Sequence, residues 1–208
     1  MFIRALAGLL VLISIFACSS REPSSSDVRN PTAPSRLTDP TPPANPTTSV
    51  VAQPSPSANV IVNMQDACDP ATFNAVLGEG TCLRNGGVKF DDFIAQLTRL
   101  AFAGAWHFAP NNVNAKTGET FLVRNRGGEV HTFTEVEEFG GGIVPDLNAL
   151  ARVPTVAPEC QALDADDFVA PGDTYREEIE EAGNEKYQCC IHPWMRLEVH
   201  VSAPQGHQ

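Results

Sequence analysis

One stretch near the carboxyl end of the chain restricts its possible folds more than any other. Residues 187–195 have the sequence YQCCIHPWM, so a thiol, an imidazole and a thioether follow each other closely at Cys189, His192 and Met195. The segments on both sides have the character of strands, which predicts that the motif is a loop between two strands. Such a loop can bring several metal-binding side chains to one point.

These three side chains are soft donors of the kind that copper prefers. An electron-transfer copper site has two imidazoles and one thiolate in a trigonal plane with a weak axial thioether, because Cu(I) prefers sulfur while Cu(II) tolerates nitrogen. The candidate for the missing imidazole is His131, in the segment EVHTF far upstream. We therefore predict one mononuclear copper ion held by His131, Cys189, His192 and Met195, with a backbone carbonyl as the alternative to the thioether.

With these residues the sequence resembles the type 1 (blue) copper proteins of the cupredoxin superfamily, and its loop spacing is similar to that of amicyanin. One match is Tyr-x-Cys-x-x-His-Pro-x-Met-Arg, which runs here from Tyr187 to Arg196. The other is GETFLVRN at residues 118–125, followed by a short loop to His131. The resemblance covers about the last hundred residues, and it departs from the family pattern in having a second cysteine, Cys190, beside the expected ligand.

The resemblance implies a plastocyanin-like β-sandwich that passes single electrons between redox partners and is not an enzyme. Cys189 would supply the strong bond to copper, and His131 and His192 would complete the plane. The ring edge of His192 would reach the surface through an apolar patch formed by Pro193 and Trp194. One mononuclear type 1 copper ion is the implied cofactor.

The strand pattern also predicts a mainly β fold for residues 104–203, a Greek-key β-sandwich in which turns are marked by Gly, Pro and Asn. The region between residues 139 and 165 is expected to be irregular, with at most one short helix near residues 145–150. The expected strands are residues 105–108, 120–125, 130–136, 174–179, 186–189 and 197–201.

Residues 61–103 are predicted to form a short helical extension before the β domain. Residues 69–78 have an N-cap Asp, a Pro at the first helical position and a final Gly. Residues 90–100 place five apolar side chains on one face at helical spacing. In an exported protein Cys68 and Cys82, which flank the first helix, are expected to form a disulfide, the alternative being a second metal site.

The chain has six cysteines, which fit a single copper thiolate. If Cys18 carries a lipid and Cys189 binds metal, Cys160 and Cys190 remain once Cys68 and Cys82 are paired. Neighbouring residues of a strand point to opposite faces, so Cys190 is expected to turn away from the metal and to pair with Cys160. The alternative is that both adjacent thiols bind, in a two-thiolate or dinuclear copper site.

The amino-terminal region predicts export. Residues 1–17 have a basic start and an apolar run typical of a signal peptide, and Cys18 follows a sequence that resembles a bacterial lipobox. Residues 18–60 are rich in Pro, Ser and Thr and form a linker in this interpretation, either a tether to a membrane or a passive spacer. We expect a lipoprotein on the periplasmic side of a bacterial membrane, with ordinary cleavage and secretion as the alternative.

The formal net charge of −11 and the carboxylates concentrated in residues 176–185 exclude a nucleic-acid partner and favour a basic one. A c-type cytochrome, a dehydrogenase or an oxidase would fit, and the protein is expected to be a monomer. The alternative is that the acidic surface only aids solubility. His107, His200 and His207 are not expected to be ligands.

Two other functions remain open, a copper carrier or chaperone and a redox-inert cupredoxin-like binding module. A carrier would be favoured by a tail rich in Met or His, which the sequence lacks, and an inert module by a lost ligand, whereas all four ligands are present. A copper enzyme would need a second cluster of histidines, and the chain has no His-x-His pair.

Overall fold

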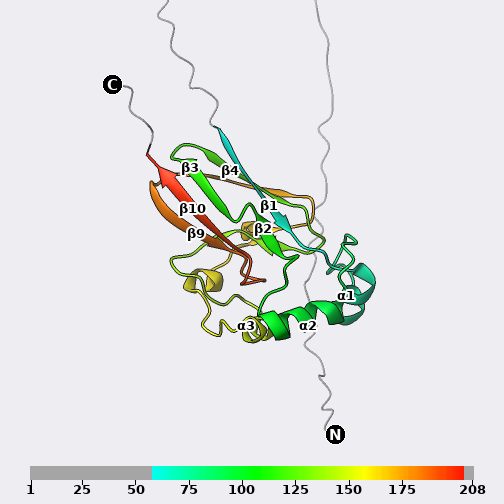
Figure 1. Cartoon of the computed structure of the whole chain (residues 1–208). Coiled ribbons are helices and arrows are strands. Elements are labelled where there is room, and N and C mark those ends of the chain that lie inside the picture. Colours follow the sequence, from blue (N-terminus) through cyan, green and yellow to red (C-terminus); the bar gives the residue numbers. More distant parts are fainter. Residues whose placement is uncertain (1–57, 204–208) are drawn as a thin grey trace, which may run out of the picture. The chain divides into compact units, whose positions relative to one another are not determined.

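The computed structural model describes residues 58–203, which are mainly β (Figure 1). The expected signal peptide at 1–17, the lipidation of Cys18, the linker apart from its last residues and His207 lie outside the described residues. The strands are β1 (Asn59–Gln65), β2 (His107–Ala109), β3 (Asn112–Lys116), β4 (Thr120–Asn125), β5 (His131–Thr132), β6 (Thr134–Glu135), β7 (Phe168–Val169), β8 (Thr174–Glu178), β9 (Gly183–Gln188) and β10 (Arg196–Ser202). The helices are α1 (Pro70–Leu77), α2 (Phe90–Leu100) and α3 (Pro145–Leu150), with short 3₁₀ turns η1 (Pro158–Gln161) and η2 (Ala165–Asp167).

Two four-stranded sheets make up the body of the fold. One has the strand order β2-β1-β4-β8 and the other β3-β10-β9-β6, while β5 and β7 form a separate pair. Both large sheets are mixed, because β1 runs parallel to β4 and β10 runs parallel to β3. The mainly β, two-sheet class predicted from the sequence is confirmed.

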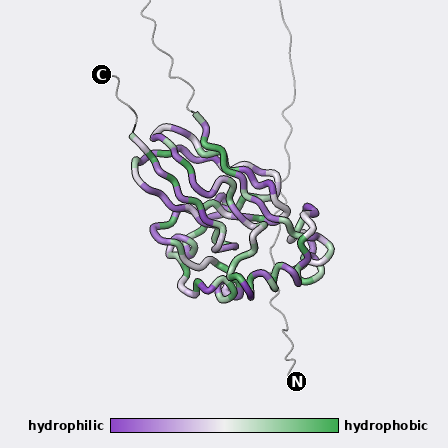
Figure 2. Tube along the Cα trace, in the orientation of Figure 1, coloured by the Kyte–Doolittle hydropathy of each residue, from purple (hydrophilic) through white to green (hydrophobic). Residues whose placement is uncertain are grey.

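The core lies where the two sheets face each other. In β10 the residues alternate between buried and exposed, with Leu197, Val199 and Val201 turned inward, as expected of a strand that is wet on one side. Phe121 of β4 packs against Tyr187 of β9 with ring centroids 5.3 Å apart, so side chains of the two sheets meet directly. Figure 2 shows the same change between hydrophobic and hydrophilic residues along the strands.

The helices begin and end as their sequences predict. Asp69 caps α1 by accepting a hydrogen bond from the backbone N–H of Thr72, and Gly78 follows its last turn with φ of 109°. Helix α2 buries Phe93 and Leu97, and the disulfide between Cys68 and Cys82 is present. In the part of the chain that the structure describes, no helix is long and apolar enough to cross a membrane.

The structure differs from the expected boundary between a helical extension at 61–103 and a β domain at 104–203. Residues 59–65 form β1, which lies between β2 and β4 in the first sheet. Helices α1 and α2 are therefore an insertion between the first two strands of the sheet and not an extension that precedes it. Strand β1 has seven residues, and its parallel partner β4 lies far away in the sequence. Such a pairing leaves little sign in the sequence of the strand itself.

The irregular region after β6 contains α3 at the expected place. It also contains the turns η1 and η2 and the strand β7, which the sequence did not predict. Strand β3 was missed as well; its sequence NVNAK offers only two apolar side chains. These elements matter for the site because β7 pairs with β5, in which His131 lies opposite Val169.

Candidate metal centre

The loop between β9 and β10 folds tightly, as the motif in residues 187–195 predicts. The backbone N–H of Cys189 donates to the carbonyl of Met195 at 3.0 Å, and the N–H of Met195 donates to the carbonyl of His192 at 2.9 Å. These bonds close the loop on itself just where the two antiparallel strands end. They place Cys189 and His192 on the same side, with both side chains buried.

His131 reaches the same point from the other side of the fold. The loop that leads to it is shaped by Asn125, whose side-chain amide donates to the carbonyls of Glu129 and Val169 and whose oxygen accepts from the N–H of Gly127. The backbone N–H of Thr132 then donates to the sulfur of Cys189 at 3.4 Å. The upstream loop and the downstream loop are thus joined at the expected thiolate.

Three donor atoms converge in this place. The sulfur of Cys189 lies 3.8 Å from Nδ1 of His131 and 3.8 Å from Nδ1 of His192, and the two nitrogens are 3.3 Å apart. In zinc sites the metal lies about 2.3 Å from sulfur and about 2.05 Å from nitrogen. If the angle between donors at the metal is 120°, these bond lengths place sulfur and nitrogen about 3.8 Å apart and two nitrogens about 3.5 Å apart. The donor set therefore fits a metal ion held in a nearly trigonal plane.

The electrostatics favour the thiolate that a metal requires. Burial alone would raise the pKa of Cys189, but hydrogen bonds with His131 and His192 and their positive charge outweigh burial and lower this pKa well below its ordinary value. Burial would lower the pKa of His131, but the hydrogen bond to Asp66 and the nearness of Cys189 raise it to about 9. These contacts favour the thiolate form of Cys189.

Each histidine has a buried carboxylate beside its other ring nitrogen. Nε2 of His131 lies 2.9 Å from Oδ2 of Asp66, and Nε2 of His192 lies 3.7 Å from Oε2 of Glu129. The indole N–H of Trp106 donates a hydrogen bond to that same oxygen of Glu129. Burial is the main reason that the pKa of Glu129 is raised, whereas hydrogen bonds from His131 and from the loop amides keep the pKa of Asp66 low despite its burial.

The surroundings of His192 differ from the expectation that its ring edge reaches solvent. The residue is only 3% exposed. Trp194 packs edge-on against its ring with centroids 5.5 Å apart, and Trp194 and Trp106 both contact Phe93 of α2. The helical insertion therefore covers the end of the site where a solvent-exposed ring was expected.

The two residues expected to form an apolar patch, Pro193 and Trp194, lie beside the covered histidine. Pro193 is buried and Trp194 is half-buried, and both line a surface hollow of about 290 Å³ together with Arg196. Its rim includes Leu100 and Phe102, which are 42% and 47% exposed. An apolar surface thus lies one aromatic ring away from His192.

Met195, the expected axial ligand, is fully buried in the main core beside this loop. It follows His192 by three residues, and its backbone contributes both hydrogen bonds that close the loop. The structure gives its thioether no polar partner among the described residues. Its place in the loop is compatible with the axial role that the sequence suggests.

The adjacent thiol of Cys190 is used elsewhere. Cys190 forms a disulfide with Cys160 of η1, within a small apolar cluster that also contains Val136 and Ala157. This is the pairing that strand alternation predicts, and it contradicts a site in which Cys189 and Cys190 both bind metal. Among residues 58–203, Cys189 is the one cysteine outside a disulfide.

A second group of potential ligands does not form a second metal site. Asp66, Cys68 and Glu129 approach one another closely enough to hold an ion. However, the sulfur of Cys68 is bonded to Cys82, so the thiolate that would bind metal does not exist in this state. Of the two clusters, only the one at Cys189 offers a free thiol.

Three residues that shape the site were missed from the sequence: Asp66, Glu129 and Trp106. Asp66 lies 65 positions before the histidine that it contacts, and nothing in its neighbourhood distinguishes it from a surface aspartate. Glu129 stands two positions before His131, so its nearness to the site was a usable signal. Trp106 was assigned to a strand-like segment, and only the packing of α2 shows its role.

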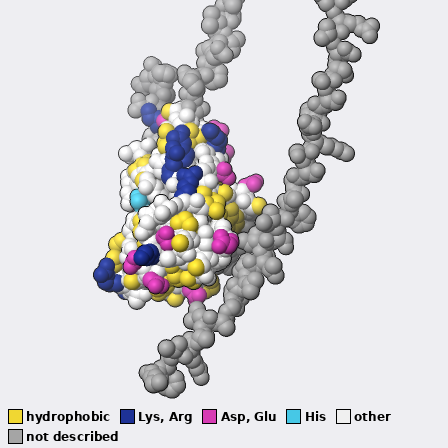
Figure 3. All heavy atoms as spheres, turned by 90° about the vertical axis from the view of Figure 1, so that its right-hand side faces the viewer, with side chains coloured by type: hydrophobic (Ala, Val, Ile, Leu, Met, Phe, Trp, Pro, Cys, Tyr) yellow, Lys and Arg dark blue, Asp and Glu magenta, His cyan; other side chains and the backbone are white. Residues whose placement is uncertain are grey.

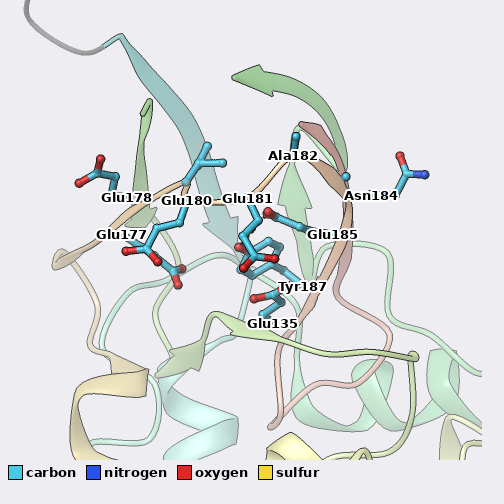
Figure 4. Close-up of a pocket in the computed structure, with 11 residues that line it drawn as sticks. Glu135, Glu177, Glu178, Glu180, Glu181, Ala182, Asn184, Glu185 and Tyr187 are labelled. Atoms are coloured by element: carbon cyan, nitrogen blue, oxygen red, sulfur yellow. Dashed lines mark hydrogen bonds between the residues drawn. The ribbon is translucent and has the colours of Figure 1, made fainter. Parts of the chain in front are cut away.

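An acidic hollow of about 570 Å³ lies apart from the site's ligands, at the turn between β8 and β9 (Figure 4). Carboxylates from β6, β8, β9 and the turn surround Tyr187, and several of them point into the same space. The labelled acids are Glu135, Glu177, Glu178, Glu180, Glu181 and Glu185. The charge concentration expected at residues 176–185 is thus gathered on one surface.

No protein-family model and no curated protein matches the chain. Among solved structures it is similar to a purple cupredoxin from Nitrosopumilus maritimus, with 17% identity and a TM-score of 0.39 over 70% of this chain and 100% of that one. A reduced amicyanin mutant is 23% identical (TM-score 0.30), over 44% of this chain and 70% of the other. The oxidised plastocyanin of Dryopteris crassirhizoma is 14% identical (TM-score 0.31), over 47% and 89%. At such identities the function must be inferred from the chain's own site.

Proposed function

We propose that this protein is a one-electron carrier with a mononuclear type 1 copper ion bound by His131, Cys189 and His192, with Met195 as the axial ligand. The observation that carries the proposal is the convergence of two imidazole nitrogens and one thiolate sulfur, 3.3–3.8 Å apart and shielded from water. Two histidines and one cysteine in a plane, with a weak methionine, are the ligands of blue copper sites. Bound copper would supply the change between Cu(II) and Cu(I).

The residues of the chain keep the site unchanged between the two states. The loop hydrogen bonds of Cys189 and Met195 and the contact between Thr132 and the sulfur hold the donors without needing a metal to draw them together. The side chains of Cys189 and His131 are fully buried. A fixed, dry ligand set suits electron transfer, because little has to move or be resolvated when the charge changes.

The same burial argues against a carrier or chaperone function. Such a protein must pass its metal to a partner, which requires an approach to the ligands by an incoming thiolate or imidazole. Here His192 is 3% exposed and lies beneath Trp194, while α2 covers both tryptophans. Ligand exchange would require this cover to open, whereas an electron has only to cross the short distance through the closed cover.

Two surfaces support the proposal that the partner is a redox protein. The hollow lined by Pro193 and Trp194 offers an apolar contact one ring from His192, and its rim carries the exposed Leu100 and Phe102. The acidic hollow at the turn after β8 would attract a basic partner such as a c-type cytochrome or a basic face of a dehydrogenase or oxidase. Attraction by the acidic surface and electron transfer at the apolar one would then be separate tasks.

We further propose that the protein works as a monomer outside the cytoplasm, as a lipoprotein anchored through Cys18 or as a secreted protein. The two disulfides support export, because such bonds persist in oxidising compartments. The surface in Figure 3 supports a monomer. On the face that carries α1, exposed apolar side chains are interspersed with charged ones and are not gathered in one continuous patch.

The test is the visible spectrum of the protein after addition of Cu(II). We expect an intense band at about 600 nm from charge transfer between thiolate and copper. The band should disappear on reduction and should be absent in Cys189→Ser. His131→Gln should lose it too, while His200→Gln, at an exposed histidine that hydrogen-bonds Asn184, should keep it. Weak absorption without this band, with the thiol of Cys189 still titratable, would refute the proposal and favour a carrier or a metal-free binding module.

A further inference from the structure

The contact between Asp66 and His131 is the most deeply buried contact between a carboxylate and a histidine at the site. Oδ2 of Asp66 lies 2.9 Å from Nε2 of His131, and the two side chains are 1% and 0% exposed. Asp66 follows β1 directly, so it belongs to neither of the two loops that carry the ligands. It was not expected from the sequence, and the copper ligand set does not include it.

Asp66 is held as a carboxylate by the donors around it. The backbone N–H groups of Gly128 and Glu129 donate to it at 2.9 and 3.0 Å, and the N–H of Cys68 donates at 3.2 Å. With the ring of His131, four N–H donors surround two oxygens, which matches an ionised carboxylate, since that group only accepts. A protonated acid would set its own O–H against one of these donors.

The chain is built to permit this close approach. A Cβ atom at Gly127 would overlap Oδ2 of Asp66, and a Cβ atom at Gly128 would come within 2.7 Å of the sulfur of Cys68. Glycine at both positions lets the loop before His131 lie directly on the segment of Asp66. The disulfide from Cys68 to Cys82 then fixes that segment two residues further on.

The bond has two consequences for the ring of His131. A carboxylate accepts only, so Nε2 must carry the hydrogen. In the neutral ring that a metal binds, the lone pair of Nδ1 is then directed at the point shared with Cys189 and His192. A negative charge on the far side of a ligand ring also raises its basicity and stabilises the more positive state of the metal. His192 lacks such a bond, because its Nε2 is 3.7 Å from Glu129.

We propose that Asp66 is a positioning residue of the copper centre: its carboxylate fixes the tautomer of His131 and, by favouring Cu(II) over Cu(I), lowers the reduction potential. This inference rests on the proposed copper function. It concerns a residue outside the ligand set and assigns unequal roles to the two histidines. The copper-loaded protein gains or loses one electron, and Asp66 itself is not changed.

The experiment compares the full-length wild-type protein with Asp66→Asn and with Glu180→Gln, which removes the same unit of charge at an exposed position of the acidic turn. For each we would measure the midpoint potential and the affinities for Cu(II) and Cu(I). Loss of a partner of a ligand typically lowers metal affinity about 10- to 100-fold. We expect Asp66→Asn to lose about tenfold more affinity for Cu(II) than for Cu(I), which corresponds to a rise of about 59 mV in potential, and Glu180→Gln to change little.

A second measurement does not depend on the variant. In the Cu(I)-loaded wild-type protein, which is diamagnetic, the hydrogen on Nε2 of His131 should be visible by ¹H–¹⁵N NMR and should exchange slowly with solvent, as its 0% exposure implies. The hydrogen on Nδ1 should be absent.

The outcomes separate the two proposals. If the wild-type protein shows no blue band, the copper function fails and the role of Asp66 falls with it. If the band is present but Asp66→Asn weakens Cu(II) and Cu(I) equally, or shifts the potential no more than Glu180→Gln does, Asp66 is a structural residue only. If the NMR spectrum shows His131 without a hydrogen on Nε2, the assigned tautomer is wrong.

Discussion

Helix α2 protects the site, and the side chain that does so most directly is Phe93. It is 3% exposed and contacts both tryptophans that flank the covered histidine, with ring centroids 4.6 Å from Trp106 and 6.0 Å from Trp194. A buried aromatic ring removes about 150–250 Å² from water, which at about 25 cal/mol/Å² gives an upper value of about 4–6 kcal/mol. Measured Phe→Ala changes in cores cost about 3–5 kcal/mol. We expect Phe93→Ala to lower the free energy of unfolding by this latter amount.

The assay is urea unfolding of the metal-free protein, followed by a ligand test of the copper form. In Phe93→Ala the cavity should open a path to His192, so that added imidazole or azide changes the blue band, which it should not do in the wild-type protein. Phe102→Ala is the matched control, because it makes the same truncation at a side chain that is 47% exposed. A loss in Phe93→Ala no larger than in the control, or a band that stays insensitive to added ligands, would refute the view that α2 is the cover.

Other consequences of the structure can be measured in the same way. Replacing Cys160 and Cys190 together by serine opens a loop of 30 residues, and the entropy gained by the unfolded chain should lower the free energy of unfolding by about 3.6 kcal/mol. The blue band should persist at lower temperature if the metal needs only Cys189. Burial, and after it repulsion by neighbouring acids, raises the pKa of Glu177 in the folded state. The stability that this residue contributes is therefore fully present below about pH 4.5 and is lost as the pH rises through the pKa of the folded state. Between pH 4.5 and 7 the wild-type protein should therefore lose more stability than Glu177→Gln, and equal pH profiles would contradict this. Gly127→Ala should displace Asp66 and weaken copper binding, measured by competition with a chelator, whereas Gly118→Ala, where a Cβ meets nothing within 4 Å, should only strain the turn.

The group of His131, Cys189 and His192 that the structure brings together could be predicted in part from local sequence. Cys189, His192 and Met195 lie within one loop, and this combination of side chains is typical of a copper site. His131 was harder to predict, since it depends on a resemblance over the strand before it. Helices α1 and α2 were predicted from their caps and apolar faces, which are also local signals.

What the sequence did not predict depends on contacts between distant segments. Strand β1 pairs with β4, 61 positions away, and Asp66 meets His131 only because this pairing carries the end of β1 into the site. The cover over His192 depends on how α2 packs, and its apolar face indicates only that the helix packs against something. Long-range register and the choice of partner are not encoded in the residues of one segment.

The direction of β1 has a practical consequence. The strand enters the sheet at Asn59 and ends at Gln65, next to the residue that contacts His131, and seven residues of strand span roughly 20 Å. In Figure 1 the described chain begins and ends at the same end of the sheets, away from α2 and α3. A linker fused to either end, or a graft of the protein onto an electrode through its first strand, would therefore leave Trp194 and the hollow beside it free to face a partner.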